Sequence, residues 1–205
     1  MSREIEAFKR VMPRVCWCPR CNVPVVGEEC SLCGGFTLVV RVTPPGDVRP
    51  AFERDVEHVR ELLYGLLGDW DGVDLLLPES KFVLLNKIQY PDAADEVVVD
   101  GQILGHRFFD VERMEWRFKP LYNGVAGMLE HGIGYYAIVD RPALARRYEV
   151  RKKHVVEGEL PRKRGEFVAV ATANGRYHAV AEYLGASRPV SYTHLRAHET
   201  EADIV

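Results

Sequence analysis

Four cysteines in two pairs have the spacing of a metal-binding site. Cys18 and Cys21 form the first pair and Cys30 and Cys33 the second, with two residues inside each pair. A Cys-x-x-Cys turn directs both sulfurs toward one centre, and two such turns supply the tetrahedral thiolate set that structural zinc prefers. Iron suits the same sulfurs. The spacing therefore predicts a closed structural metal centre, with zinc expected and no open position for catalysis.

The fifth cysteine, Cys16, lies just outside this set and is expected to be a spare thiol. A thiol redox role for Cys16 together with the other four is the alternative, and metal analysis would exclude it. Thiolate metal sites and a free thiol fit a reducing compartment. The segment from Met1 to Arg14 has no secretory pattern, and no stretch approaches the roughly 20 apolar residues of a membrane helix. We expect a cytoplasmic protein.

The residues that could do other chemistry do not form a catalytic set. His106 and His131 have no partner at catalytic spacing, and no pair of nucleophile and base is evident. Thr43–Asp47 is expected to be a structural turn, because its two prolines remove the backbone donors that a phosphate loop needs. Four acids could form a metal site but are expected in a solvated loop and hairpin: Asp92, Asp95, Glu96 and Asp100.

Basic residues concentrate in the second half of the chain. Nine Lys/Arg face three Asp/Glu between Arg141 and Arg164. Such a run favours contact with a polyanion, and Tyr148 and His154 could stack on exposed bases. An ordinary solvated face is an equal alternative from these residues alone. The candidate RNA contacts are Arg146, Arg147, Arg151, Lys152, Lys153, Arg162, Lys163 and Arg164.

Hydrophobic periodicity predicts an α+β fold in three parts. The β-branched run over 36–42 predicts a strand, and apolar steps of three and four residues predict a helix over 51–67. Asp100-Gly101 and Asn174-Gly175 predict tight hairpins. Further strands are expected at 82–85, 113–118, 135–139, 167–171 and 177–183, and a weak helix at 121–130. The resulting parts are a zinc ribbon (1–42), a mixed α/β middle region (43–119) and a small β-rich barrel (120–189).

Several segments of residues 14–188 resemble a known family. They include Trp17-Cys18, Cys21 to Pro24, Thr43 to Phe52, Leu85-Asn86-Lys87 and Asp95 to Gly101, with a PUA-like pattern in Val155–Gly158, Gly165–Val170 and Gly175–Ala181. Together they resemble the N-terminal part of archaeal proteins of the phosphoadenosine phosphosulfate (PAPS) reductase family. The resemblance implies a zinc ribbon, a pre-PUA region and a PUA-like pseudo-barrel that holds structured, tRNA-like RNA. It also implies a separate nucleotide-binding catalytic domain.

The last residues resemble no protein family. Val190 to Thr200 reads as the translation of a transposase-type sequencing adapter, and Glu201–Val205 would follow from the same insertion. We therefore expect 190–205 to be an artefactual tail and set aside His194 and His198 as metal ligands. The natural reading frame is then expected to continue past Pro189.

These patterns combine into one functional prediction. The chain is expected to be a non-catalytic, RNA-binding or targeting fragment of a PAPS reductase-family enzyme, without its adenine-nucleotide-binding catalytic domain. The alternative is a scaffold or protein-interaction region of a sulfonucleotide reductase, with no RNA bound.

Overall fold

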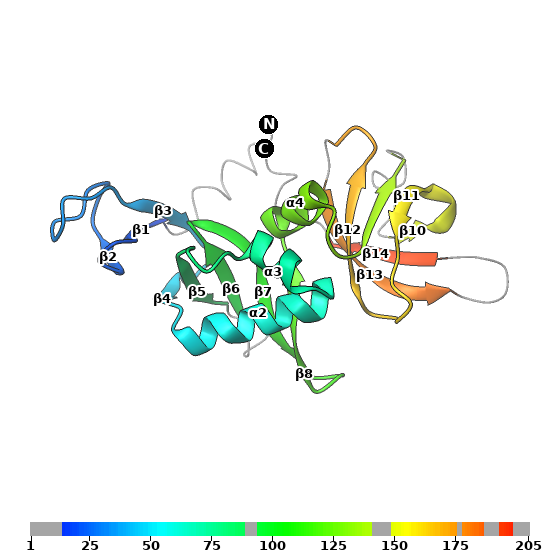
Figure 1. The fold of residues 1–205 in the computed structure, drawn as a ribbon, viewed down its shortest axis with the longest axis horizontal. Helices are drawn as coiled ribbons and strands as arrows, with labels where there is room; N and C mark the ends of the chain where they lie inside the picture. The colour runs from blue at the N-terminus through cyan, green and yellow to red at the C-terminus, as the bar shows by residue number, and fades with distance from the viewer. Residues whose placement is uncertain (1–13, 89–93, 141–148, 176–177, 187–192, 199–205) are drawn as a thin grey trace. The chain divides into compact units, whose positions relative to one another are not determined.

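A computed structural model describes residues 14–88, 94–140, 149–175, 178–186 and 193–198 (Figure 1). The α+β fold class is confirmed, because these residues form three β-sheets and three α-helices. The chain divides into two compact units. Unit 1 comprises Met1–Leu62 and Leu77–Phe118, and unit 2 comprises Leu63–Leu76 and Lys119–Val205.

Unit 1 begins with a three-stranded ribbon. Strand β1 (Arg14–Cys18) lies between β2 (Val23–Val25) and β3 (Leu38–Arg41), and both pairings are antiparallel. The strand predicted over 36–42 is thereby confirmed. The described strands of the ribbon share a hydrophobic core with a second sheet. Buried side chains of the ribbon and of a second sheet form one cluster: Trp17, Val40, Val42, Leu84 and Val98.

The second sheet of unit 1 has its five strands in chain order. They are β4 (Asp47–Pro50), β5 (Val83–Lys87), β6 (Ala94–Val99), β7 (Gln102–Asp110) and β8 (Glu115–Pro120). The predicted hairpin between β6 and β7 is confirmed. Asp100 and Gly101 have φ angles of 48° and 83°, the left-handed conformation that an Asp-Gly turn requires.

Helix α2 (Glu53–Leu67) confirms the helix predicted over 51–67. Its first turn is fixed by Asp55, whose carboxylate accepts a hydrogen bond from the Phe52 backbone N–H and pairs with Arg49 and Arg107. Arg107 comes from β7, is 8% exposed, and also pairs with Asp95 of β6. These ion pairs hold the start of α2 against one face of the five-stranded sheet (Figure 1).

Unit 2 contains helices α3 (Trp70–Leu76) and α4 (Tyr122–His131) and a six-stranded sheet. In spatial order the strands are β10 (Glu149–Arg151), β14 (Thr193–His198), β13 (His178–Ala186), β12 (Phe167–Thr172), β9 (Tyr136–Val139) and β11 (Val155–Glu159). Strands β9 and β12 are parallel, and the other neighbours are antiparallel. A 3₁₀ turn, η1 (Lys152–His154), connects β10 to β11.

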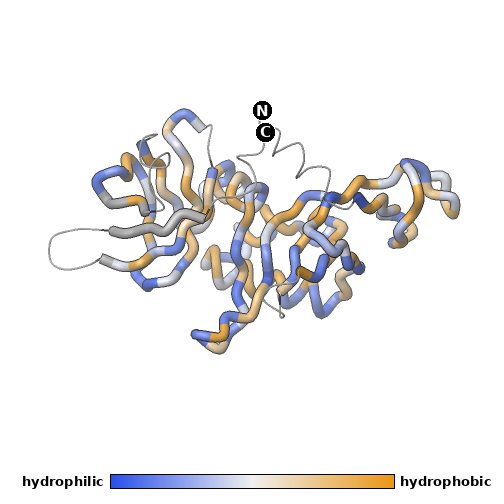
Figure 2. Tube along the Cα trace, turned by 180° about the vertical axis from the view of Figure 1, so that it is seen from behind, coloured by the Kyte–Doolittle hydropathy of each residue, from blue (hydrophilic) through white to orange (hydrophobic). Residues whose placement is uncertain are grey.

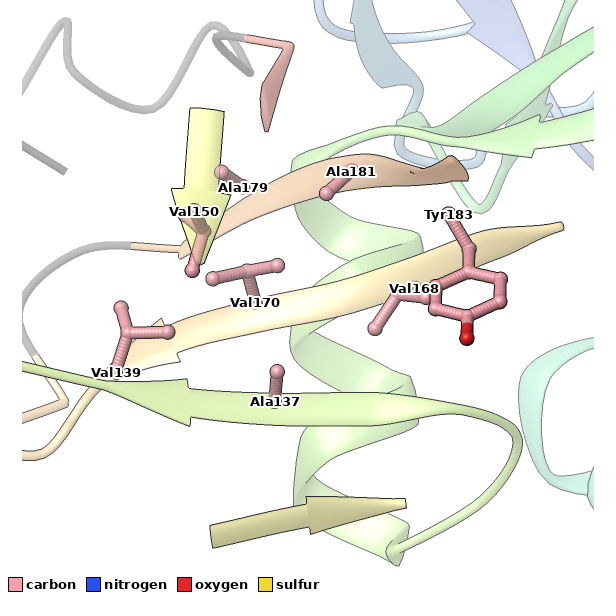
Figure 3. Packing of buried hydrophobic residues seen from close by; sticks show 8 residues of the cluster. All are labelled: Ala137, Val139, Val150, Val168, Val170, Ala179, Ala181 and Tyr183. Carbon is pink, nitrogen blue, oxygen red and sulfur yellow. The ribbon is translucent and has the colours of Figure 1, made fainter. Parts of the chain in front are cut away.

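Small and β-branched side chains fill the core of unit 2. Alternate residues of β12 and β13 project toward one side of the sheet and meet Ala137, Val139 and Val150, while α4 lies behind the strands in this view (Figure 3). All six residues of β12 are buried, whereas hydrophobic and hydrophilic residues are interspersed along the chain as a whole (Figure 2). None of the helices among the described residues is long and apolar enough to cross a membrane.

The predicted tail includes a strand of this sheet. The backbone of β14 pairs with β13 and with β10, so 193–198 completes the sheet order between those two strands. The remaining tail positions, 190–192 and 199–205, lie outside the described residues. The adapter origin of the tail stays a prediction.

Candidate functional site

Two matching turns carry the four predicted cysteines. The Asn22 backbone N–H donates to the Cys18 carbonyl over 2.9 Å, and the Gly34 N–H donates to the Cys30 carbonyl over 2.8 Å. Asn22 and Gly34 both have positive φ, 55° and 66°. Asn and Gly tolerate this conformation best, which explains why each pair is followed by one of them.

The turns bring the four sulfurs of Cys18, Cys21, Cys30 and Cys33 together. All four lie within 4.8 Å of one another, and the Cys18 and Cys33 sulfurs are 3.6 Å apart. Four sulfurs about 2.3 Å from a tetrahedral ion are about 3.8 Å apart, so the cluster has the dimensions of a metal site. The Cys21 backbone N–H also donates to the Cys18 sulfur over 3.3 Å. These cysteines could hold a metal ion, and Cys16 does not belong to the group.

Without a metal, the Cys21 thiol holds its proton. Hydrogen bonding with Cys33, followed by burial and the other two thiols, raises the pKa of Cys21 to about 12. Because a metal binds cysteine as the thiolate, its entry would displace the Cys21 proton, and metal affinity would fall as the pH falls.

The first cysteine turn, Cys18–Asn22, is connected directly to the core of unit 1. The indole Nε1 of Trp17 donates to the Asn22 side-chain oxygen over 3.1 Å, and the ring is only 3% exposed. The centroid of the ring lies 6.3 Å from that of Phe82, in the segment that leads into β5. The conformation of the turn therefore helps to position a core residue.

The structure separates the predicted basic face into two groups. Lys153 is exposed just before β11, whereas Arg162, Lys163 and Arg164 are exposed after it. A five-residue strand is about 16 Å long, and it carries exposed Glu157 and Glu159 between the two groups. Arg146 and Arg147 lie outside the described residues, and only the backbone of Arg151 and Lys152 is described.

A buried polar cluster in unit 1 was not predicted. Glu96 was expected in a solvated loop, but it is 1% exposed. Its carboxylate accepts hydrogen bonds from the Thr43 backbone N–H at 3.0 Å, the Thr43 hydroxyl at 2.5 Å and the Asn86 amide at 2.6 Å. His106, which has no partner at catalytic spacing in the sequence, has its Nε2 3.7 Å from this carboxylate, within ion-pair distance. The solvated interpretation of Glu96 was therefore wrong.

The other predicted acids lie elsewhere. Asp95 pairs with Arg107, Asp100 pairs with Lys81, and Asp92 is outside the described residues. Burial by itself would raise the pKa of Glu96, but His106 and the hydrogen bonds from Thr43 and Asn86 outweigh it and hold the pKa below its ordinary value. Thr43–Asp47 is the structural turn that was predicted, and Glu96 fixes its first residue to the sheet.

Comparison with known proteins adds fold information. No protein-family profile matches the chain. A PUA domain from Aeropyrum pernix, APE0525, solved as a tartrate complex, has a TM-score of 0.52 and 17% identity and covers 75% of this chain and 85% of its own. The chain shares its fold with a PUA-domain protein.

A second solved structure is similar over a like share of the chain. The hypothetical protein PH0734.1 from Pyrococcus horikoshii gives a TM-score of 0.56 and 17% identity, covering 75% of this chain and 94% of its own. Each structural match covers three quarters of the chain, which is longer than the predicted barrel (120–189). The structural similarity therefore extends to residues outside the predicted barrel.

One sequence relative is much longer than this chain. The uncharacterized protein MJ0066 of Methanocaldococcus jannaschii is 34% identical over 116 residues, which are 57% of this chain and 23% of the relative. The matched region thus spans about a quarter of the relative.

Proposed function

We propose that this chain is the N-terminal RNA-binding or targeting region of a PAPS reductase-family enzyme. Its metal ribbon has a structural role, and its PUA-like barrel holds structured, tRNA-like RNA for an adenine-nucleotide-binding catalytic domain elsewhere in the parent protein. The observation that carries the RNA proposal is the PUA-type fold together with exposed Lys153, Arg162 and Lys163 on unit 2. The length of MJ0066 is consistent with a larger parent.

RNA binding with the salt dependence of phosphate contacts tests this proposal. We expect the chain to bind a tRNA pool, with an affinity that falls steeply as salt rises. Replacing Lys153, Arg162 and Lys163 with Ala should weaken binding at least about tenfold and make the slope of log K against log salt shallower by about 2 to 3. Filter binding or fluorescence anisotropy over a salt series measures both quantities.

A matched control removes three exposed cations from unit 1. The triple variant of Arg41, Arg54 and Lys87 to Ala should keep the affinity within about twofold of the unmodified chain and should leave the slope unchanged. Equal losses in both triple variants would mean that binding reflects net charge only. No binding at low salt would contradict the RNA proposal.

A scaffold without RNA is the second candidate. The exposed Glu157 and Glu159 between the two basic groups favour it, because they repel a continuous phosphate backbone. RNA that copurifies with the chain, detected by the absorbance ratio at two wavelengths, would exclude the scaffold.

We propose that the ion in the four-cysteine group is zinc. The all-thiolate donor set and the tetrahedral spacing of the sulfurs support this choice, and iron is the chemical alternative. Elemental analysis should give about one zinc per chain and no stoichiometric iron. Zinc loss in a Cys30→Ser variant but not in Cys16→Ser would assign it to the group of four.

A further inference from the structure

Exposed apolar side chains occur together at the metal-binding end of the ribbon. Val26 is fully exposed, Leu32 is 73% exposed and Phe36 is 90% exposed. Leu32 lies inside the second cysteine turn, and none of the three belongs to the core that the ribbon shares with the five-stranded sheet. Burying a large apolar side chain contributes about 1.5 to 3 kcal/mol, so three of them in water within one short segment indicate an interaction surface.

Hydrogen bonds hold this end of the ribbon in one conformation. Phe36 pairs with Glu29 in an isolated antiparallel bridge, and the Thr37 backbone N–H donates to the Glu28 carbonyl over 3.0 Å. The Thr37 hydroxyl also donates to the Gly27 carbonyl over 2.9 Å. The backbone that carries the apolar side chains is therefore ordered before a partner binds, which lowers the entropic cost of docking.

Charges of both signs surround the apolar side chains. Arg20 directly precedes Cys21, whereas Glu29 follows Glu28 and directly precedes Cys30. The sulfurs of the two cysteines lie within 4.8 Å of each other, so the charges of both signs belong to the same end of the ribbon. All three charged side chains are exposed, and within the described part of the chain none of them forms an ion pair.

The other charges near the ribbon lie away from this end or are paired. Arg14 and Arg41 are opposite each other on β1 and β3, and Arg14 is about 13 Å along the strand from Cys18. Asp100 and Lys81, at the turn that approaches β3, pair with each other. We call the exposed apolar and charged residues of the metal-binding end the ribbon tip: Arg20, Val26, Glu28, Glu29, Leu32 and Phe36.

We propose that the ribbon tip is a contact surface between two copies of this chain. In a two-fold symmetric contact each copy uses the same surface, so that surface must be complementary to itself. The ribbon tip meets this requirement, because Arg20 of one copy can pair with Glu28 and Glu29 of the other while the apolar side chains pack together. The two acids repel nucleic-acid phosphates, and Arg20 repels a basic peptide. None of the cations assigned to RNA takes part, so this proposal stands or falls separately from the RNA proposal.

Sedimentation velocity of the full chain over a concentration series tests the proposal. In reducing buffer, the molar mass should rise from that of one chain toward twice that value between about 1 and 300 µM. The dimer should be weak, because the ribbon tip is far smaller than the roughly 20 to 30 residues per side of a stable interface. Leu32→Ser with Phe36→Ser should raise the dissociation constant of the dimer at least about tenfold. Because both side chains are exposed, this variant should keep the unfolding temperature of the unmodified chain at low concentration.

Charge reversal tests the two-fold arrangement. Arg20→Glu alone, and Glu28→Arg with Glu29→Arg alone, should each weaken dimerisation about fivefold, because like charges then face each other. An equimolar mixture of these two variants should dimerise within about twofold of the unmodified chain, since opposite charges face each other again across the contact. A partner other than a second copy cannot produce this rescue.

The turn between β7 and β8 supplies a matched control. Val111 and Met114 are 72% and 73% exposed there, with charges of both signs nearby in the sequence. Val111→Ser with Met114→Ser should leave dimerisation unchanged. An equal loss in both double serine variants, a chain that stays monomeric at about 300 µM, or a mixture that dimerises no better than its two components would overturn the proposal.

Discussion

At the scale of single residues, the buried carboxylate of Glu96 makes stability depend on pH. Its pKa is lowered in the folded state, so the stabilisation it gives is present above its unfolded pKa of about 4.3 and is lost as the pH falls through the folded value. Glu96→Gln should destabilise the protein by about 2 kcal/mol at pH 7, because it replaces charge-assisted hydrogen bonds to Thr43 and Asn86. The difference from the unmodified protein should shrink as the solution is acidified below about pH 4.

Urea unfolding of both proteins across this pH range measures the effect. The unmodified protein also loses stability in acid through Asp55 and Asp110, whose pKa values are lowered, so only the difference between the two proteins reports on Glu96. Glu115→Gln, at a side chain that is 56% exposed, serves as the control and should change stability by less than about 0.5 kcal/mol. A constant difference between pH 7 and pH 3 would show that Glu96 does not act through its charge.

At the scale of elements, Gly158 decides whether β11 can pair with β9. A Cβ atom at this position would lie 2.5 Å from the Tyr136 carbonyl oxygen and 3.0 Å from the Ala137 Cα, both of them backbone atoms. Gly158→Ala should therefore cost about 2 to 4 kcal/mol, measured by thermal or urea unfolding. Gly65→Ala, in α2 with nothing within 4 Å of the added carbon, should instead stabilise the helix by up to about 1 kcal/mol. Similar effects of both substitutions would contradict the close backbone approach.

The helices and strands differ in whether the sequence alone could predict them. The β6–β7 hairpin and α2 were predictable because the Asp100-Gly101 turn and the apolar steps are local signals. Strand β11 was missed because four of its five residues are exposed, so it lacks two-residue alternation. Helix α3 has only seven residues, one of them glycine. The four cysteines were found from their spacing, whereas Glu96 was misassigned because its partner Thr43 lies 53 residues away.

At the scale of the molecule, the metal centre is expected to stabilise unit 1 as a whole. The ribbon shares its core with the five-stranded sheet, and Trp17 connects that core to the first cysteine turn through Asn22.

Removing the metal should let this turn relax, so the unfolding temperature should fall by about 5 °C or more. In a variant that keeps Trp17 as its only tryptophan, emission should shift to longer wavelength on chelation because the buried ring gains access to water. Cys16→Ser should behave like the unmodified chain in both measurements. Identical unfolding temperatures and identical Trp17 emission with and without the chelator would contradict this prediction. They would mean that the metal stabilises only the two cysteine turns and not the core of unit 1.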